Sequence, residues 1–226
     1  MAGLIYIFDE KAGADELTLK GELHKYLIKV RRHSVDDELA FRNRDEMKTL
    51  HLYKLVDVEP RAATLSLISS KTVEVKSDKE LHIAWCVIDQ KSVEKVLPSL
   101  CEIGVSRISF ITCERSQKNF KPDFKRYERI VEASMQQSGR TSLMEFDSYK
   151  NIETFIEEFP DTKVFDFCDN VLKGGSSFKR VLIGCEGGFS PNEKEFLKSQ
   201  EVFRLNSAMV LRSESAVMAV ASKILL

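Results

Sequence analysis

The stretch Val181-Leu-Ile-Gly-Cys-Glu-Gly-Gly-Phe-Ser-Pro-Asn-Glu193 decides how the second half of this chain folds. It begins as a short apolar strand, passes through a glycine turn and ends as the start of a helix. Glycine permits backbone angles that other residues resist and lets a ligand approach the backbone closely. Ser190 and Glu193 match a capping box, and Pro191 stands at the first helical position. The stretch therefore predicts a strand–turn–helix unit.

Known phosphate and nucleophile motifs do not explain this turn. It lacks the GxGxxG spacing of a dinucleotide site, the Gly-Lys-Ser/Thr of a P-loop and the GxSxG of a nucleophile elbow. By shape alone it is either a ligand-binding turn or only a tight connection between a strand and a helix. The pattern leaves both interpretations open.

The sequence around the turn alternates short apolar runs with longer helical patterns. Such alternation is typical of an α/β domain with a mainly parallel sheet. The expected strands cover residues 81–88, 107–112, 163–167 and 180–184, and the expected helices cover residues 92–103, 123–137, 152–158, 192–199 and 213–226. Apolar positions 216, 217, 220, 224 and 225 of the last helix predict a buried face, packed inside the chain or against a second subunit.

The first part of the chain has a different pattern. Short alternating runs at residues 51–58 and 63–68 predict a small β-barrel or sandwich. A polar stretch at residues 71–80 precedes the change of pattern, so we expect a first domain at residues 1–74 and a second at residues 75–226.

A cationic segment lies within the first domain, at residues 24–33. In a helix Tyr26, Leu27 and Val30 would face inward. The basic side chains would point outward and form either a phosphate-binding face or an ordinary solvated helix face; they are Lys25, Lys29, Arg31 and Arg32.

Composition excludes several classes of protein. The 34 Lys and Arg nearly balance the 35 Asp and Glu, giving a formal charge of -1, so the protein is not uniformly basic. No stretch approaches the roughly 20 apolar residues of a membrane span, and a cytosolic protein is expected. The five cysteines are scattered and odd in number, which predicts reduced thiols. Neither they nor the histidines have metal-ligand spacing, so no metal site is expected.

A second candidate segment is Phe203-Arg-Leu-Asn-Ser-Ala-Met-Val-Leu-Arg-Ser-Glu-Ser-Ala216, a strand-like start followed by a polar turn and a helix opening. Arg212 could orient a phosphate or a base of a substrate there. The alternative is a surface ion pair between Arg212 and Glu214.

Together the two segments resemble the cofactor motifs GPEGGFS and LGxxILRTETA of the SPOUT methyltransferases, and within them the ribosomal RNA small subunit methyltransferase E family. Residues 102–105 (EIGV), 114–116 (ERS) and 132–140 (EASMQQSGR) are similar to that family's ELGV, ERS and EAxxQSGR segments, in the same order. Residues 24–32 are similar to its HLxxVLR stretch. Cys185 replaces the usual proline, Asn206 a glycine, and Ser213 and Ser215 threonines. Cys185 is expected to be structural, because no histidine base lies near it in sequence.

The resemblance implies a PUA-like β-barrel that grips RNA, a SPOUT α/β domain with a trefoil knot, and a homodimer with active sites at the subunit boundary. It also implies S-adenosylmethionine as methyl donor and N3 of a uridine in 16S ribosomal RNA, in the small ribosomal subunit, as acceptor. Two alternatives stay open: a SPOUT enzyme acting on another RNA or on a ribose hydroxyl, and a non-catalytic RNA-binding protein.

The candidate site residues divide into catalytic, RNA-contact and cofactor-binding groups. Arg212 would stabilise the anion that forms as the N3 proton leaves, with Glu214 beside it and Arg115 as a further catalytic candidate. Arg140 is an RNA-contact candidate with Lys25, Lys29, Arg31 and Arg32, and a structural ion pair is the alternative for Arg115 and Arg140. The expected cofactor-binding residues are Phe165, Phe167, Leu182, Ile183, Gly184, Glu186, Gly187, Gly188, Leu205, Asn206, Val210 and Leu211.

Overall fold

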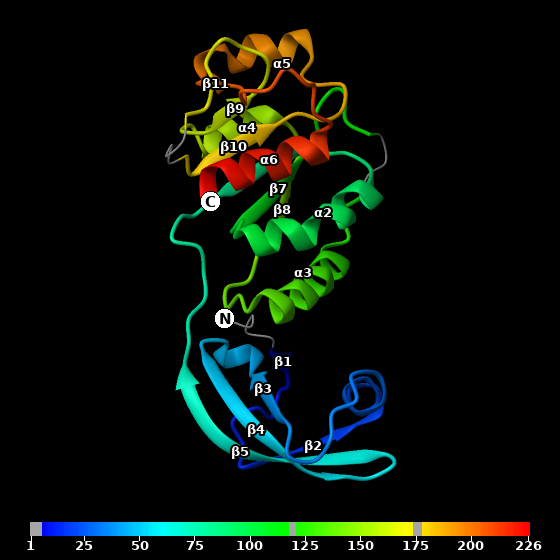
Figure 1. The fold of residues 1–226 in the computed structure, drawn as a ribbon. Helices are drawn as coiled ribbons and strands as arrows, with labels where there is room; N and C mark the ends of the chain where they lie inside the picture. The colour runs from blue at the N-terminus through cyan, green and yellow to red at the C-terminus, as the bar shows by residue number, and fades with distance from the viewer. Residues whose placement is uncertain (1–5, 118–120, 174–177) are drawn as a thin grey trace. The chain divides into compact units, whose positions relative to one another are not determined.

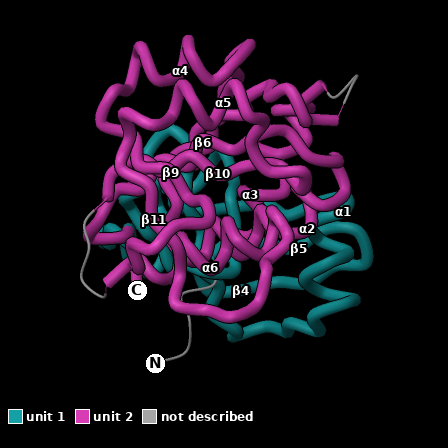
Figure 2. The backbone as a smooth tube through the Cα atoms, turned by 90° about the horizontal axis from the view of Figure 1, so that it is seen from above, with its two compact units in different colours: residues 1–76, 135–142 teal, residues 77–134, 143–226 magenta. Residues whose placement is uncertain are grey.

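The computed structural model describes residues 6–117, 121–173 and 178–226, and the chain forms two compact units. Figure 2 colours unit 1, residues 1–76 and 135–142, apart from unit 2, residues 77–134 and 143–226. The sequence placed the domain boundary between residues 74 and 75. In the structure the first division falls after residue 76, and residues 135–142 also belong to unit 1.

Unit 1 is built on a five-stranded sheet in the order β1-β3-β4-β5-β2. The strands are β1 (Ile7–Phe8), β2 (Glu16–Lys20), β3 (Glu38–Arg42), β4 (Thr49–Val58) and β5 (Ala62–Thr72), and a 3-10 turn, η2, covers Arg44–Glu46. Among the described strand pairs of this sheet, β1–β3 is parallel and the other three are antiparallel. Because β1 and β2 are the two edges among the described residues, the sheet is a half-barrel and not a closed barrel.

The cationic segment winds as a short helix α1 (Gly21–His24) that continues as a π-helix, η1 (Lys25–Val30). Leu27 is buried, but Tyr26 is 43% and Val30 62% exposed. The expectation that all three face inward is therefore wrong for Tyr26 and Val30. The two side chains are exposed because the wider π winding shifts side chains away from the positions that an α-helix would give them.

Unit 2 contains a six-stranded, wholly parallel sheet in the order β11-β9-β10-β6-β7-β8. Its strands are β6 (His82–Cys86), β7 (Arg107–Ile111), β8 (Glu145–Tyr149), β9 (Lys163–Phe165), β10 (Arg180–Ile183) and β11 (Val202–Phe203). The helices are α2 (Gln90–Ile103), α3 (Phe124–Ser138), α4 (Ile152–Glu158), α5 (Pro191–Phe196) with the 3-10 turn η3 (Leu197–Ser199), and α6 (Ser213–Leu225). The last four residues of α3 are counted with unit 1. The expected α/β class is confirmed.

The core of unit 2 lies on both faces of β6, whose five residues are all buried. A continuous buried run is typical of a central parallel strand. Helix α6 packs against α2 and β10, as Figure 1 shows. Its residues Ala216, Val217, Val220 and Ile224 are buried within the single chain, whereas Leu225 is only half-buried. Most of the apolar face of α6 is thus intramolecular core.

A disulfide joins Cys86, the last residue of β6, to Cys113, which lies two residues beyond β7. The two Cα atoms are 5.8 Å apart. The expectation of five reduced thiols is therefore wrong for this pair, because two neighbouring parallel strands bring together cysteines that are distant in sequence. Cys101, Cys168 and Cys185 are free thiols. Within the described part of the chain, no helix has the length and apolar character needed to cross a membrane.

Candidate functional site

A cavity of about 380 Å³ lies in unit 2, beyond the carboxyl ends of β9, β10 and β11. Most of its wall comes from three segments: residues 165–167 after β9, the glycine turn 183–189 after β10, and residues 204–211 after β11. Strand β10 lies between β9 and β6, so the order of the strands reverses here. Ligands of open α/β sheets bind at such a reversal, outside the carboxyl ends of the strands.

The glycine turn needs glycine for two different reasons. Gly188 has a φ of +63°, in the left-handed region that other residues resist. A Cβ on Gly187 would lie 3.4 Å from both Cβ and Cδ of Arg115, whose side chain covers this part of the turn. Ser190 and Glu193 then form the expected capping box, which begins α5 with Pro191 in its first turn. The predicted strand–turn–helix unit is confirmed.

Ser213 fixes the start of α6 to the glycine turn. Its hydroxyl donates a hydrogen bond to the carbonyl oxygen of Gly184 at 2.6 Å and accepts one from Nε1 of Trp85 at 2.8 Å. Trp85 and Ser213 are buried and Gly184 is half-buried, and both Gly184 and Ser213 line the cavity. The two candidate segments of the sequence are thus adjacent in space.

The loop after β7 closes another side of the cavity and carries Arg115. Nη1 of Arg115 donates a hydrogen bond to the carbonyl oxygen of Gly187 at 2.7 Å. The carbonyl oxygen of Arg115 accepts one from the Cys185 thiol at 3.2 Å. Burial raises the pKa of Cys185, so the thiol keeps its proton and can donate. This contact fits a structural role for Cys185.

Charged side chains that the sequence did not single out also reach the cavity. Asp166 pairs with Lys194 at 2.8 Å, and Arg204 lines the wall close to β11. The signal that could have found Asp166 is its place directly after β9, because residues at the carboxyl ends of parallel strands gather around one crevice. Lys194 does not follow a strand, so its sequence position did not indicate that it would reach the cavity.

Ten of the twelve expected cofactor-binding residues line the cavity. Leu182 and Asn206 do not: Leu182 is fully buried in β10, and Asn206 is exposed. The ten are Phe165, Phe167, Ile183, Gly184, Glu186, Gly187, Gly188, Leu205, Val210 and Leu211.

The three catalytic candidates differ in position. Arg115 lines the cavity, whereas Arg212 is exposed at the start of α6, between two lining residues. Oε2 of Glu214 is buried and has no hydrogen-bond partner among the residues that the structure describes. No ion pair joins Arg212 to Glu214 in the described part of the chain, so the structure does not show the alternative contact that the sequence left open.

The RNA-contact candidates lie in unit 1. Lys25, Lys29, Arg31 and Arg32 are exposed, and Lys25 is 3.9 Å from Glu22. Arg140 is buried, and its Nε donates to the carbonyl oxygen of Ser142 at 2.7 Å. That bond favours the structural alternative for Arg140.

Comparison with known proteins agrees with the resemblance seen in the motifs. A family model described as an RNA methyltransferase domain matches residues 75–225. Two curated proteins named ribosomal RNA small subunit methyltransferase E, from two strains of Helicobacter pylori, are 34% and 33% identical to this chain over 221 residues, covering 96% of the chain and 97% of each relative.

The fold is also that of a solved relative. The crystal structure of a ribosomal RNA small subunit methyltransferase E from Neisseria gonorrhoeae, bound to S-adenosylmethionine, superposes with a TM-score of 0.74 at 16% identity. The match covers 97% of this chain and 96% of that one. By its sequence over nearly its full length, this chain belongs to the ribosomal RNA small subunit methyltransferase E family.

Proposed function

We propose that this protein transfers a methyl group from S-adenosylmethionine to N3 of a uridine in 16S ribosomal RNA of the small ribosomal subunit. The observation that carries the proposal is the cavity formed by the glycine turn and residues 204–211, the two segments whose motifs resemble the family's cofactor motifs. Relatives that share a third of their residues with this chain carry the name of a small-subunit ribosomal RNA methyltransferase.

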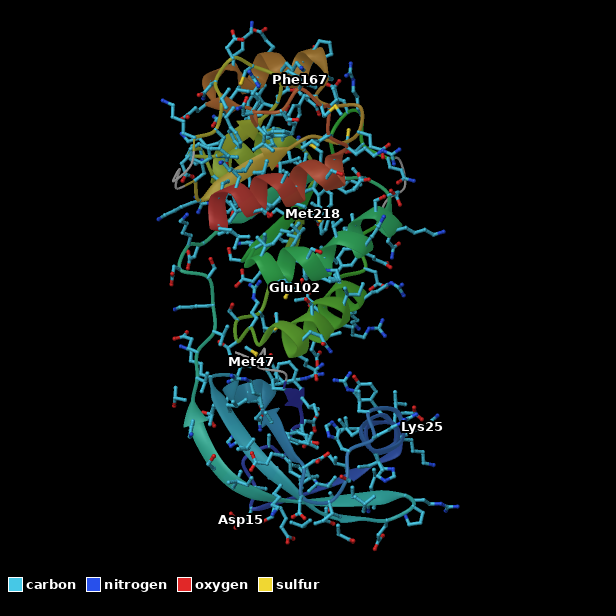
Figure 3. All side chains as sticks on the ribbon, viewed as in Figure 1. Asp15, Lys25, Met47, Glu102, Phe167 and Met218 are labelled. Carbon is cyan, nitrogen blue, oxygen red and sulfur yellow. A yellow bond between two sulfur atoms is a disulfide. The ribbon has the colours of Figure 1, made fainter. Side chains whose placement is uncertain are left out.

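The cavity suits a donor of this kind. Its volume lies within the range of about 300–1,000 Å³ typical of small-molecule sites. Phe167 and Met209 are 74% and 78% exposed beside it and offer apolar surface to an adenine ring. Figure 3 labels Phe167, which lies in the loop after β9 near α5. The backbone of the glycine turn offers polar groups close to the ligand at Gly188, where a Cβ would meet no described atom within 4 Å.

When bound, S-adenosylmethionine supplies a methyl carbon attached to a positively charged sulfur. The protein's task is then to hold the acceptor nitrogen in line with that carbon. A cation near the carbonyl oxygens that flank N3 stabilises the anion left when the imide proton departs. We assign this role to Arg212 and a supporting role to Arg115, which already lies in the wall of the cavity.

The first experiment measures donor binding and then transfer. Calorimetry of the full chain with S-adenosylmethionine should show saturable binding; an RNA-binding protein without catalytic function would show none. Tritiated donor is next incubated with small ribosomal subunits from a strain that lacks this gene, and the modified nucleotide is mapped. We expect label on uridine N3 in 16S RNA.

The same experiment distinguishes the alternatives. Label on transfer RNA or on a ribose hydroxyl would keep the donor but overturn the acceptor. Donor binding without transfer to any RNA fraction would overturn the enzyme assignment. Deletion of the gene with unchanged methylation of small-subunit RNA would contradict the proposal in the cell.

We further propose that unit 1 is a PUA-like module that grips RNA through Lys25, Lys29, Arg31 and Arg32. Its half-barrel sheet and the exposure of these four side chains support this role. Replacing all four by Ser should weaken RNA binding and reduce its dependence on salt, because fewer counterions are released. Unchanged RNA affinity would remove this surface from the proposal.

Finally, we propose a trefoil knot in unit 2 and a homodimer in the cytoplasm, where ribosomal subunits are found. The placement of β10 between β6 and β9, with α6 packed back on α2, supports the knot. Exposed Phe167, Met209 and Val210 beside the cavity support a second subunit that covers them. A crystal structure would settle the path of the chain, and analytical ultracentrifugation the number of subunits.

A further inference from the structure

The carboxylate of Glu193 is buried beside the cavity and bonds to two segments that are far apart in sequence. Glu193 is 5% exposed. Its Oε2 accepts a hydrogen bond from the Ser190 N–H at 2.7 Å, within the capping box of α5. Its Oε1 accepts one from the Glu114 N–H at 2.8 Å, in the loop after β7. A capping box needs only the first bond. The second is therefore an additional function of this side chain.

The loop that receives this second bond is a tight turn. The Cys113 N–H donates to Oγ of Ser116 at 2.9 Å, and the Ser116 N–H donates back to the Cys113 carbonyl oxygen at 3.0 Å. The disulfide to Cys86 holds the first residue of the turn. Glu193 holds the second residue, Glu114, so it acts directly beside Arg115.

Arg115 projects from this turn onto the glycine turn. Its Nη1 bonds to the Gly187 carbonyl oxygen, and its side-chain carbons cover Gly187. Among the described residues, no hydrogen bond or ion pair involves Nε or Nη2 of Arg115. The guanidinium thus lies at the cavity with donors left for a substrate, and its position depends on how the turn is anchored.

The hydrogen bond between Glu193 and the turn at residues 113–116 differs from the contact that Arg115 makes with Cys185. The contact of Arg115 with Cys185 is a weak thiol hydrogen bond, whereas the buried carboxylate of Glu193 accepts a hydrogen bond from the Glu114 backbone N–H. Hydrogen bonds with a charged acceptor are about twice as strong as neutral ones. Removal of this acceptor leaves the Glu114 N–H without the partner it has in the structure, which favours movement of the turn.

We propose that Glu193 is a positioning residue that holds the Arg115 guanidinium at the cavity through its hydrogen bond to the Glu114 backbone. The proposal rests on the proposed methyl transfer, in which Arg115 acts on the acceptor base. Glu193 itself does not line the cavity and touches neither donor nor acceptor. Its removal should therefore lower turnover with little effect on donor affinity.

The test is a double-mutant cycle between Glu193→Gln and Arg115→Ala in the full chain. Gln is nearly identical in shape and can still accept one hydrogen bond within the capping box, but its NH₂ group cannot accept from the second N–H. We expect kcat to fall between about tenfold and hundredfold, the effect of a displaced catalytic group. The dissociation constant of S-adenosylmethionine should change less than about threefold, as expected for a residue that binds no donor.

The cycle separates positioning from a general structural effect. If Glu193 acts through Arg115, Glu193→Gln should lower kcat by less than about twofold once Arg115 is already Ala. The control variant loses only a helix cap away from the cavity: Asn151→Ala at α4, where Asn151 Oδ1 accepts from the Thr154 N–H. It should lose stability like Glu193→Gln but keep kcat nearly unchanged.

Hydrogen–deuterium exchange gives a readout that does not need activity. Glu193→Gln should speed exchange in the peptide that contains residues 113–117, and the control Asn151→Ala should speed it at the start of α4 only. Unchanged exchange at residues 113–117, or independent effects of the two substitutions on kcat, would overturn the proposal. If the wild-type chain transfers no methyl group, the proposed function fails, and exchange alone decides whether Glu193 holds the turn.

Discussion

Gly188 shows how much a single backbone angle contributes to the site. Its φ of +63° lies where a Cβ is disfavoured, yet a Cβ there would meet no atom within 4 Å. The constraint is thus conformational and does not come from crowding. The sequence predicted both close approach of a ligand and positive φ for Gly184, Gly187 and Gly188. Only the structure separates Gly188, which has the positive φ, from Gly187, which makes room for Arg115.

Gly188→Ala should therefore cost about 1–2 kcal/mol of stability and weaken binding of S-adenosylmethionine, because the left-handed conformation penalises Cβ by that amount. Gly188→Asn should lose less, since Asn tolerates this region better than Ala. Urea unfolding and calorimetry measure the two quantities. Equal losses for Ala and Asn would show that the angle is not the cause.

Substitution of Arg212 should lower activity without lowering stability, unlike substitution of Gly188. It is exposed, so Arg212→Ala should change the free energy of unfolding by less than about 0.5 kcal/mol. Turnover should fall by about two orders of magnitude if its charge stabilises the uridine anion. Lys223→Ala, which removes another exposed charge of α6, is the matched control. Near-normal turnover of Arg212→Ala would exclude it from the mechanism.

Strands and helices were predictable where the pattern reflects burial. The apolar run of β6 and the helical spacing of α4 gave bounds within a few residues of those observed. Strand β8 was not predicted, because it lies at the sheet edge and its sequence EFDSY has no apolar run. The π winding of η1 was also missed, because an i→i+5 pattern leaves no distinct signal in a short cationic segment.

His82 makes the stability of the paired strands β6 and β7 sensitive to pH. Its Nε2 is 2.6 Å from Oγ of Ser109 on β7, and its ring packs edge-on against Phe155 and Phe159. Burial, with Arg107 nearby, lowers the pKa of His82 from 6.5 to about 4. As pH falls, the unfolded chain therefore takes up a proton before the folded chain does.

Stability from His82 should be fully present above about pH 6.5 and should decline as the pH falls towards 4, by about 3 kcal/mol in all. His82→Gln, which does not titrate, should have a smaller pH dependence over this window. Trp85, the single tryptophan of the chain, lies in β6 and reports unfolding of unit 2 by fluorescence. Equal slopes for the two proteins between pH 7 and 5 would contradict the assignment.

The whole molecule is less modular than its sequence indicates. Residues 135–142 belong to unit 1, although the first four of them are the end of α3, whose earlier residues belong to unit 2. Within unit 1, the Thr141 N–H donates to the Val75 carbonyl oxygen at 2.8 Å, and the Val75 N–H donates to Thr141 Oγ1 at 3.0 Å. Sequence periodicity could not show that the chain returns to unit 1 here. The pattern predicts one continuous helix over residues 123–137 and carries no information on which unit the end of the helix packs against.

Thr141→Val should therefore destabilise unit 1, although it lies in the second half of the chain. Val keeps the shape but leaves the Val75 N–H unpaired, at a cost of about 1–3 kcal/mol. Hydrogen–deuterium exchange should quicken in β5 and the residues up to 76, while unit 2 keeps its protection. Faster exchange confined to unit 2 would show that residues 135–142 do not support unit 1.

Strand β10, which carries the glycine turn, lies between β6 and β9 although it follows both in the chain. During synthesis its two neighbours therefore leave the ribosome first, each with an open edge of unpaired backbone groups. Such edges can pair with other chains, and pairing between strands distant in sequence is slow. The placement of one strand thus makes the newborn protein vulnerable to aggregation until the cavity closes, and makes chaperone protection most valuable in that interval.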